Sequence, residues 1–279
     1  MFNKNLISGV CFIGSLLLNP MAVNALTIDV ELSGEVKQGG FILGKTNASN
    51  TVKLNGKSIA VFDNGDFVFG FSRDDKKTHT LTIKNTDGET ITETLTPEIR
   101  QYKIQRIEGI AKKIMKPDPV AVARAKQDSS QVKAARESFS EIDAFAKGFI
   151  APIEGIITGV YGSQRYYNGV PKSPHYGLDY AGKTGDPVKA PADGTVVLYV
   201  ADMFYSGGTM IIDHGFGITS SFLHLSDAYV KTGDKVKQGE VVAAVGSSGR
   251  ATGPHLDWRI NWYQMRLDPM FVLKTKPIK

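Results

Sequence analysis

Short apolar runs separated by glycine-containing turns are the feature that most limits the folds open to this 279-residue chain. Between residues 149 and 273 such runs recur at short intervals, as in 194–200 (GTVVLYV), 208–213 (GTMIID) and 240–245 (EVVAAV). They are rich in valine and isoleucine, and no stretch longer than about ten residues has helical periodicity. We therefore predict that residues 149–273 form an all-β domain, followed by a basic tail at 274–279.

Residues 26–98 have a different β pattern, in which alternating strands are joined by hairpin turns. The turn signals are Asn-Gly at 55–56 and 64–65 and Asp-Gly at 87–88. These pairs favour tight hairpins. We predict a small antiparallel sandwich that resembles the immunoglobulin-like modules of exported bacterial proteins. We place His79, next to a charged turn, on its surface.

Residues 99–148 are predicted to be a helical linker. Asp118 is a helix cap and Pro119 suits the first helical position. The segment 120–146 is rich in Ala, Lys, Arg, Glu and Gln and is interrupted at Ser129-Ser130. This predicts one broken helix or two, which either pack against the last domain or shield its groove.

The beginning of the chain predicts export. Residues 1–25 have the charged, apolar and small-residue order of a signal peptide, with cleavage expected after Ala25. The apolar run at 6–18 is shorter than the ~20 residues of a membrane span, and we expect no membrane span in the mature chain. The single cysteine, Cys11, lies in this segment. Catalysis by cysteine, a disulfide and a cysteine metal ligand are therefore excluded from the mature chain.

The charge of the chain is mildly basic, with 33 Lys and Arg against 28 Asp and Glu, a formal net charge of +5. This balance suits an acidic polymer such as a cell wall. The sequence has no arginine-rich stripe or aromatic platform, and we expect no nucleic-acid partner.

Histidine and aspartate are grouped in a way that points to a metal site. Three of the five histidines are His175, His224 and His255, with Asp179 four residues after the first and Asp257 two after the last. Residues i and i+2 of a strand share one face, so His255 and Asp257 should point the same way. A catalytic zinc site needs about three protein ligands and an open water position, which these side chains can supply.

The surrounding motifs come in a fixed order, and they are SPHYGLDYA at 173–181, VKAPADGTV at 188–196, IDHGFG at 212–217, SFLHL at 221–225, DKVKQG at 234–239, VGSSG at 245–249 and TGPHLDW at 252–258. Over roughly residues 155–270 the chain resembles the lysostaphin-type (LytM-like) zinc metalloendopeptidases, which cut peptide bonds in bacterial peptidoglycan. The resemblance implies a compact antiparallel β-sheet domain with its metal groove along one sheet face.

The resemblance also implies roles for individual residues. His175 and Asp179 would be the first two ligands of one Zn²⁺, and His224 and His255 would be catalytic histidines that flank the attacking water. For substrate binding, the nearby candidates are Arg165, Tyr166 and Tyr167, for which plain surface exposure is the alternative. Two smaller expectations concern His214, as a structural residue at a strand end rather than part of the site, and Gly177, as a turn residue.

The chain departs from the family pattern at the third ligand, where Asp257 replaces the second His of a His-x-His motif. A carboxylate binds zinc at about the same distance as imidazole, roughly 2.0 to 2.2 Å. Two carboxylates would cancel the formal charge of Zn²⁺, so we expect a weaker Lewis acid at which Mn²⁺ competes better. The alternative is a lost metal site.

These observations predict an exported zinc metalloendopeptidase that hydrolyses peptidoglycan cross-links, with a Gram-negative periplasm favoured over the extracellular space because wall-targeting repeats are missing. The alternative is a catalytically weak or inactive wall-binding protein or an activator of another hydrolase. A general secreted peptidase is a third class. A protein partner bound through the sandwich, and a latent form with the open metal position filled by the linker or sandwich, stay open.

Overall fold

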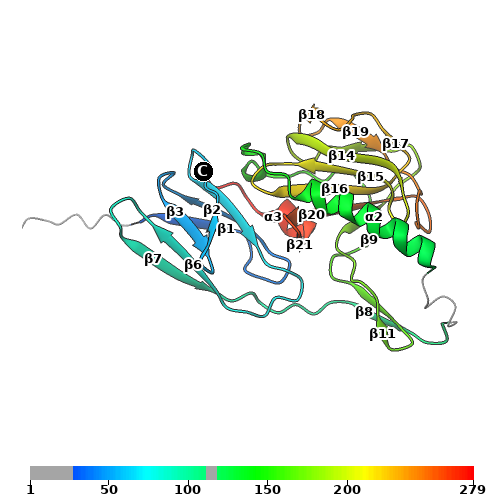
Figure 1. Cartoon of the computed structure of the whole chain (residues 1–279), viewed down its shortest axis with the longest axis horizontal. Coiled ribbons are helices and arrows are strands. Elements are labelled where there is room, and N and C mark those ends of the chain that lie inside the picture. The colour runs from blue at the N-terminus through cyan, green and yellow to red at the C-terminus, as the bar shows by residue number, and fades with distance from the viewer. Residues whose placement is uncertain (1–27, 111–117) are drawn as a thin grey trace, which may run out of the picture.

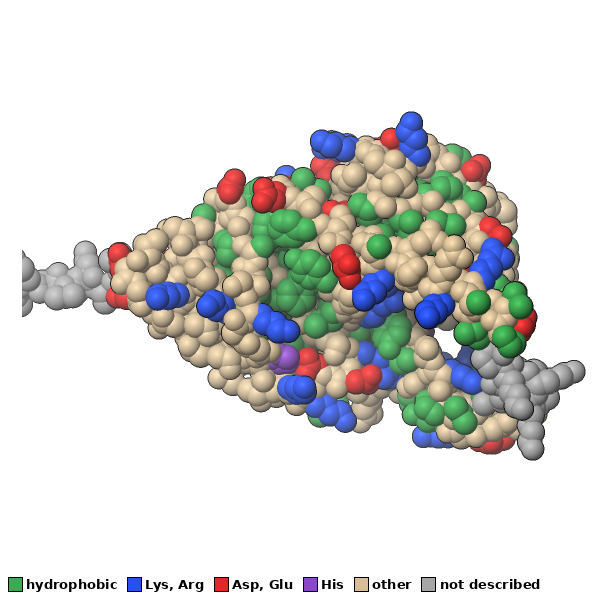
Figure 2. All heavy atoms as spheres, viewed as in Figure 1, with side chains coloured by type: hydrophobic (Ala, Val, Ile, Leu, Met, Phe, Trp, Pro, Cys, Tyr) green, Lys and Arg blue, Asp and Glu red, His purple; other side chains and the backbone are tan. Residues whose placement is uncertain are grey.

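The computed structural model describes residues 28–110 and 118–279 (Figure 1). The predicted signal peptide lies outside these residues. Within the described part, no helix combines the length and apolar character needed to span a bilayer. Lys and Arg side chains are scattered over the visible face rather than gathered in one stripe (Figure 2).

The N-terminal domain consists of two antiparallel sheets packed face to face. One sheet has the order β1-β2-β5 and the other β4-β3-β6-β7. Their bounds are β1 Val30–Ser33, β2 Phe41–Thr46, β3 Thr51–Leu54, β4 Lys57–Ile59, β5 Asp66–Gly70, β6 His79–Lys84 and β7 Thr90–Leu95. Ile42 and Phe69 from the first sheet share a buried core with Val52 and Ile83 from the second. The sandwich is therefore present, and its immunoglobulin-like class stays a prediction.

The expectation that His79 lies on the surface is wrong. Its side chain is buried at the start of β6, 3.0 Å from the carboxylate of Asp75 and 2.8 Å from the amide of Asn55. The hydrogen bond between Asn55 and Nδ1 offsets part of the lost hydration of this buried imidazole, and the Asp75 carboxylate lies close to Nε2 without a hydrogen bond to it.

The C-terminal domain is built on an antiparallel sheet with the strand order β18-β14-β15-β16-β20-β12-β9, to which β21 adds by pairing with β20. The smaller sheet β13-β19-β17 packs nearby. The bounds are β9 Ile157–Gly159, β12 Leu178–Ala181, β13 Pro187–Lys189, β14 Gly194–Met203, β15 Gly207–Asp213, β16 Ile218–Leu225, β17 Asp227–Ala228, β18 Lys235–Val236, β19 Val241–Ala244, β20 His255–Trp262 and β21 Met265–Leu267. The mostly β character of this region is confirmed, with a short helix α3, Pro269–Lys274, at its end.

Two faces of the large sheet have different environments. Residues that alternate along β16 and β20, such as Phe222, Leu256 and Trp258, are fully buried in an apolar core. The opposite face carries polar side chains, among them Ser221 and Asp257. Since successive side chains of a strand point to opposite faces, the strand pattern itself produces one dry face and one face that can hold a site.

The segment between the domains is less helical than predicted. It contains strand β8, Ile104–Ile107, which pairs in parallel with β10, Gln164–Tyr167, beside β11, Val170–Pro171. The edge of the β10–β11 hairpin offers unpaired backbone groups that β8 can bond. The one α-helix of this segment among the described residues is α2, Pro119–Arg136, and a 3-10 turn, η1, covers Ala144–Ala146.

Helix α2 begins as expected and ends earlier than expected. Asp118 caps it by accepting a hydrogen bond from the Val120 backbone N–H. The expected break at Ser129-Ser130 is wrong, because the helix continues through both residues to Arg136. The Ser130 hydroxyl donates to the Gln127 carbonyl at 2.6 Å, which lets a serine sit inside a helix with its polar group satisfied.

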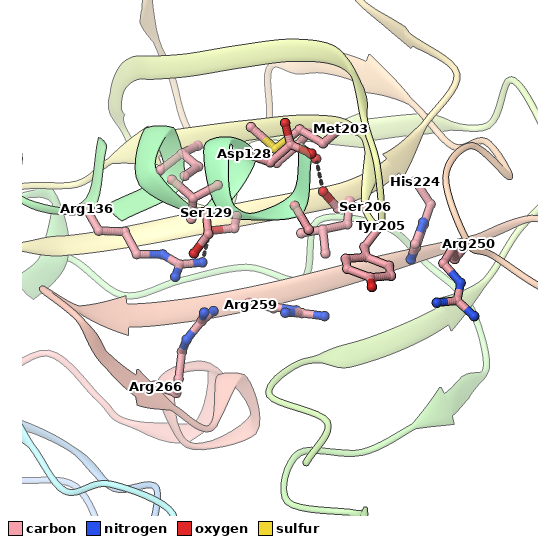
Figure 3. A pocket seen from close by; sticks show the side chains of 16 residues that line it. Asp128, Ser129, Arg136, Met203, Tyr205, Ser206, His224, Arg250, Arg259 and Arg266 are labelled. Atoms are coloured by element: carbon pink, nitrogen blue, oxygen red, sulfur yellow. Dashed lines mark hydrogen bonds between the residues drawn. The ribbon is translucent and has the colours of Figure 1, made fainter. Parts of the chain in front are cut away.

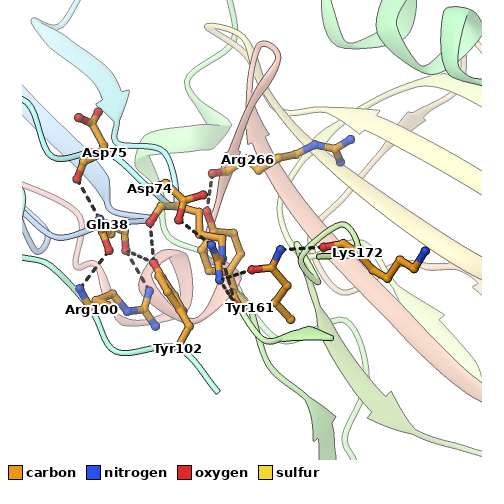
Figure 4. Close-up of polar contacts among 11 residues, drawn as sticks. Gln38, Asp74, Asp75, Arg100, Tyr102, Tyr161, Lys172 and Arg266 are labelled. Carbon is orange, nitrogen blue, oxygen red and sulfur yellow. Dashed lines mark hydrogen bonds and ion pairs between the residues drawn. The ribbon is translucent and has the colours of Figure 1, made fainter. Parts of the chain in front are cut away.

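The two domains share an interface that is both apolar and polar. Phe41 and Val68 of the sandwich pack in the same buried cluster as Leu267 and Phe271 of the C-terminal domain. Around it, Arg100 forms a 2.8 Å ion pair with Asp268, and its neighbours Gln38, Tyr102 and Tyr161 extend the polar network (Figure 4). The sandwich is thus packed against the C-terminal domain rather than tethered to it by the linker alone.

Candidate metal centre

His175, Asp179 and Asp257 come together at one point of the large sheet, where one candidate ligand atom from each lies within 4.8 Å of the others. Asp179 on β12 is paired directly with Asp257 on β20 in the antiparallel register. Directly opposed residues of two strands have Cβ atoms about 4.5 to 5.5 Å apart, so the register alone brings the two carboxylates together. His175 reaches them from the loop before β12.

Two of the three side chains have atoms that are buried without a hydrogen-bond partner. These are Nε2 of His175 and Oδ1 of Asp179, which lie 3.3 Å from each other. Burial raises the pKa of Asp179, and the nearby charge of Asp257 raises it further. A cation at their common point would satisfy both atoms and offset both effects. The residues present therefore fit a metal ion.

Two glycines make room for the carboxylates. A Cβ atom on Gly159 would overlap Oδ2 of Asp179, and one on Gly177 would overlap Oδ1 of Asp257. Neither glycine is among the residues with positive φ. The expectation that Gly177 serves a turn geometry is therefore wrong: glycine is required there because a side chain would take the place of the Asp257 carboxylate.

Arg259 is the functional residue that the sequence reasoning missed. Its Nε lies 2.9 Å from Oδ1 and 3.1 Å from Oδ2 of Asp257. Burial would raise the pKa of Asp257, but the charge and hydrogen bonds of Arg259 outweigh it and lower the pKa to about 2. The signal was present in the sequence, since residue 259 follows residue 257 at the spacing that shares a strand face.

The presence of Arg259 changes the charge expected at the site. Asp179 and Asp257 carry −2 together, and Arg259 adds +1, so with a neutral His175 the group carries −1. The family pattern, with a histidine in place of Asp257, has one aspartate and two neutral histidines, and that ligand set also carries −1. We expected two carboxylates to cancel the charge of Zn²⁺, but the buried Arg259 guanidinium offsets one of their negative charges. A carboxylate has about four lone-pair sites, so Asp257 can bind the guanidinium and a cation together.

His224 and His255 lie beside this group, with their ring centroids 4.8 Å apart. Nδ1 of His224 lies 2.9 Å from the Ser248 carbonyl, and Nδ1 of His255 lies 2.8 Å from the Gly253 carbonyl. A carbonyl oxygen only accepts, so each Nδ1 carries the hydrogen and each neutral ring keeps a free lone pair on Nε2.

The backbone and burial of His224 are both unusual. It is a non-glycine residue with a φ of 65°, a left-handed conformation that is costly for a residue with a Cβ and that occurs often at functional sites. Burial lowers the pKa of its ring. The His224 imidazole is therefore held in its neutral, proton-accepting form at neutral pH.

The predicted substrate-binding residues lie in a different sheet. Arg165, Tyr166 and Tyr167 are on β10, beside β8 and β11. The Nε of Arg165 donates to the side chain of Gln105 at 3.1 Å, and the guanidinium of Arg106 lies 5.1 Å from the Tyr166 ring. Their predicted role in substrate binding is thus not supported by a contact with the metal-capable group, and it stays a prediction.

His214 is a buried structural residue. Its Nδ1 lies 2.7 Å from the Asp193 carbonyl and its Nε2 contacts the Ser220 hydroxyl. Burial lowers its pKa to about 4. The imidazole joins the β13–β14 connection to β16 in a neutral state.

Helix α2 runs along the polar face of the sheet and closes a cavity of about 360 Å³ against it (Figure 3). His224 lines one part of this cavity. The helix is attached by polar contacts, since Arg124 pairs with Asp202 at 2.7 Å and Asp128 accepts the backbone N–H of Phe204 at 2.7 Å. The helix of the linker thus packs against the last domain, as one of the two sequence alternatives proposed, and forms one wall of this cavity.

Residues 173–269 match peptidase family M23. Over 88 residues the chain is 40% identical to the peptidoglycan DD-endopeptidase ShyA of Vibrio cholerae, a match that covers 32% of this chain and 20% of that protein. Over 103 residues it is 37% identical to the DD-carboxypeptidase/endopeptidase Mpg of Neisseria meningitidis, covering 37% and 24%. The matches thus span about a fifth to a quarter of these relatives.

One solved structure resembles both domains. A Pseudomonas aeruginosa protein described as a candidate M23 peptidase has a TM-score of 0.66 and 28% identity, over 86% of this chain and 95% of that one. The region of residues 173–269 is thus similar to peptidase family M23, in agreement with the resemblance of its motifs to the lysostaphin-type and LytM-like peptidases.

Proposed function

We propose that this protein is an exported zinc metalloendopeptidase that hydrolyses peptide cross-links of bacterial peptidoglycan. The observation that carries the proposal is the convergence of Nε2 of His175 and Oδ1 of Asp179, both buried and without hydrogen-bond partners, on a point that the Asp257 carboxylate also faces. The relatives that are peptidoglycan endopeptidases support the choice of substrate.

The residues of the site have separate roles in this proposal. His175, Asp179 and Asp257 would hold one Zn²⁺, which when bound polarises a scissile carbonyl and acidifies a water molecule. With Nδ1 of each ring donating to a carbonyl, the neutral tautomer of His224 and of His255 has its lone pair on Nε2, where it can accept the proton of the attacking water. The same ring, once protonated, can donate to the developing oxyanion or to the leaving amine.

Hydrogen bonds to the backbone hold the rings of both His224 and His255 in place. Because each Nδ1 is held by a backbone carbonyl, neither ring can rotate freely or change its tautomer when a proton arrives at Nε2. The imidazolium formed would keep its Nδ1–H bond to the carbonyl, which stabilises the positive charge. Two bases held in fixed positions beside the metal-capable group suit the proton transfers of peptide-bond hydrolysis.

The cellular location, the more distant substrate contacts and a protein partner are also part of this proposal. The predicted signal peptide supports a location outside the cytoplasm, with a Gram-negative periplasm favoured. Arg165, Tyr166 and Tyr167 are the proposed contacts to more distant parts of the substrate, and the sandwich is available for a protein partner.

One observation favours a second candidate function. Asp257 is engaged by Arg259, and a guanidinium that held this carboxylate permanently would leave only two ligands. The protein would then be a catalytically weak or inactive wall-binding protein or an activator of another hydrolase. The two functions differ in zinc affinity, since this second function predicts no tight zinc binding.

The test is digestion of purified peptidoglycan by the chain from residue 26 onward, with the products identified by mass spectrometry, in zinc and in a chelator. Zinc-dependent loss of cross-linked dimers, absent for the matched variant His175→Ala, would support the peptidase. A folded protein that binds peptidoglycan and cleaves nothing with zinc or manganese would replace it with the second function.

A further inference from the structure

Three arginines from three different elements point into the cavity under helix α2: Arg136 at the end of the helix, Arg259 on β20 and Arg266 on β21 (Figure 3). Arg136 is only 5% exposed. Two guanidinium atoms, Nε of Arg136 and Nη1 of Arg266, are buried and lack hydrogen-bond partners. The best contact of the Arg136 guanidinium is a long one, 3.4 Å from Nη2 to the Ser221 hydroxyl.

The sheet beneath these arginines is also polar and unsatisfied. Ser221 is paired with Arg259 across β16 and β20, Thr219 is paired with Asn261, and Asn261 is paired with Arg266 across β20 and β21. Both side-chain amide atoms of Asn261 and the hydroxyl of Thr219 are buried without partners. Buried polar groups in proteins are nearly always hydrogen-bonded. Thr219 and Asn261 lie below the cavity rather than in its lining, so the sheet under the arginines offers them few polar partners.

Positive charges outnumber negative ones in this cavity. Its lining holds four arginines, Arg136, Arg250, Arg259 and Arg266, and one carboxylate, Asp128, which accepts the backbone N–H of Phe204. Arg259 has Asp257 as its partner, but among the described residues neither Arg136 nor Arg266 forms an ion pair. Burial, together with the charges of neighbouring arginines, lowers the pKa of Arg136 to about 8 and that of Arg266 to about 10. Ordered water can satisfy the N–H groups, but it does not neutralise buried like charges. An anion would do both.

We propose that Arg136, Arg259 and Arg266 form a pocket that binds a carboxylate group of the peptide substrate. A guanidinium presents parallel N–H donors that match the two oxygens of a carboxylate. The pocket adjoins the metal-capable group, because Arg259 contacts the Asp257 carboxylate and His224 lines the same cavity. A peptide lying along β20 could thus place its reacting carbonyl at the metal-capable group and a free carboxylate in the arginine pocket.

This inference deepens the proposed function, since it takes the ligand to be the same peptide that is cleaved. It gives the end of helix α2 a role in substrate recognition, in addition to any shielding of the groove. The inference predicts that the protein prefers peptidoglycan peptides with free carboxylates over peptides in which those groups are amidated.

The test is calorimetric binding of a soluble cross-linked peptidoglycan fragment to the full chain in a chelator, so that no hydrolysis occurs. The same fragment with its carboxylates converted to amides is the comparison. The expected result is tighter binding of the free acid, with the preference reduced roughly tenfold to hundredfold by Arg266→Gln or Arg136→Gln. Lys126→Gln, which removes a charge from an exposed position of the same helix, should leave the preference unchanged.

Thermal melting keeps the test independent of folding. The variants Arg136→Gln and Arg266→Gln should melt no lower than the unaltered chain without ligand, because they remove buried repulsion, and Arg266→Lys serves as a charge-retaining second variant. Equal binding of acid and amide, or tight binding of inorganic phosphate with no preference between the fragments, would overturn the inference. Preference without cleavage in added zinc would count against the proposed peptidase only.

Discussion

Arg259 holds the carboxylate of Asp257 from two residues further along the same strand, with its Nε 2.9 Å from one oxygen and 3.1 Å from the other. The pair lies at the centre of the polar sheet face, where Asp257 meets Asp179 and His175 on one side. On the other side, Arg259 meets the arginines of α2 and β21. One guanidinium thus connects the metal-capable group to the proposed carboxylate pocket.

The first prediction concerns this pair. Arg259→Gln leaves the buried Asp257 carboxylate without its cation, so the metal-free protein should lose stability, on the order of 3 kcal/mol. Zinc should restore much of the loss, because the ion replaces the missing positive charge. The measurement is urea unfolding with a chelator and with zinc.

The control for that experiment is the double variant Asp257→Asn with Arg259→Gln, in which no unpaired charge remains. It should unfold closer to the unaltered chain in chelator and gain less from zinc. If Arg259→Gln had the same free energy of unfolding as the unaltered chain in chelator, the ion pair would not stabilise the fold.

The second prediction concerns metal binding. One Zn²⁺ should bind per chain and raise the melting temperature, since a ligand at a hundred times its Kd stabilises the folded state by about 2.7 kcal/mol. Asp179→Asn should remove most of this gain, whereas Asp87→Asn, an exposed turn residue in the sandwich, should keep it. Zinc titration followed by calorimetry and melting gives both numbers, and stabilisation that survives Asp179→Asn would move the metal elsewhere.

The third prediction separates metal binding from proton transfer. His224→Ala and His255→Ala should each keep zinc affinity close to that of the unaltered chain but lower kcat by roughly 10² to 10⁴, the usual contribution of a general acid or base. Steady-state hydrolysis of a cross-linked peptide, together with zinc titration, checks this. A variant that lost zinc binding in parallel with activity would show that its histidine is a ligand instead.

The fourth prediction is a pH dependence of stability that originates at His214. Burial lowers its folded-state pKa from an ordinary 6.5 to about 4, so the unfolded chain binds the proton more readily. Its contribution to stability is complete above pH 6.5, falls as the pH drops toward 4, and is lost below that value. By linkage, the loss over this window should be about 3 kcal/mol.

The matched variant for this prediction is His214→Gln, which retains hydrogen-bonding capacity without a titrating ring. Unfolding in urea at several pH values between 7.5 and 4 should show the stability difference between the two proteins shrinking as the pH falls. A constant difference across this range would mean that His214 does not stay neutral in the folded state.

Much of the architecture could be read from local sequence. Alternating and β-branched runs predicted the strands of both domains, because side-chain periodicity is set by the chain itself. The motifs around His175, Asp179 and His255 predicted the resemblance to lysostaphin-type peptidases, because each motif is a continuous stretch of sequence. The cap at Asp118 also placed the start of α2 correctly. By contrast, β8 went unrecognised, because its strand state depends on the edge of β10 in another part of the chain.

The features that only the tertiary structure decided all join distant residues. The sequence predicted that His255 and Asp257 share a face, but the placement of Asp179 opposite Asp257 depends on the register of two strands. The burial of Arg136 against Arg259 and Arg266 depends on where α2 comes to rest. Electrostatic energies depend on separation in space and on burial, whereas sequence patterns report neighbours along the chain. The strands and motifs of this protein were therefore determined locally, and the charge balance of its site was decided by packing.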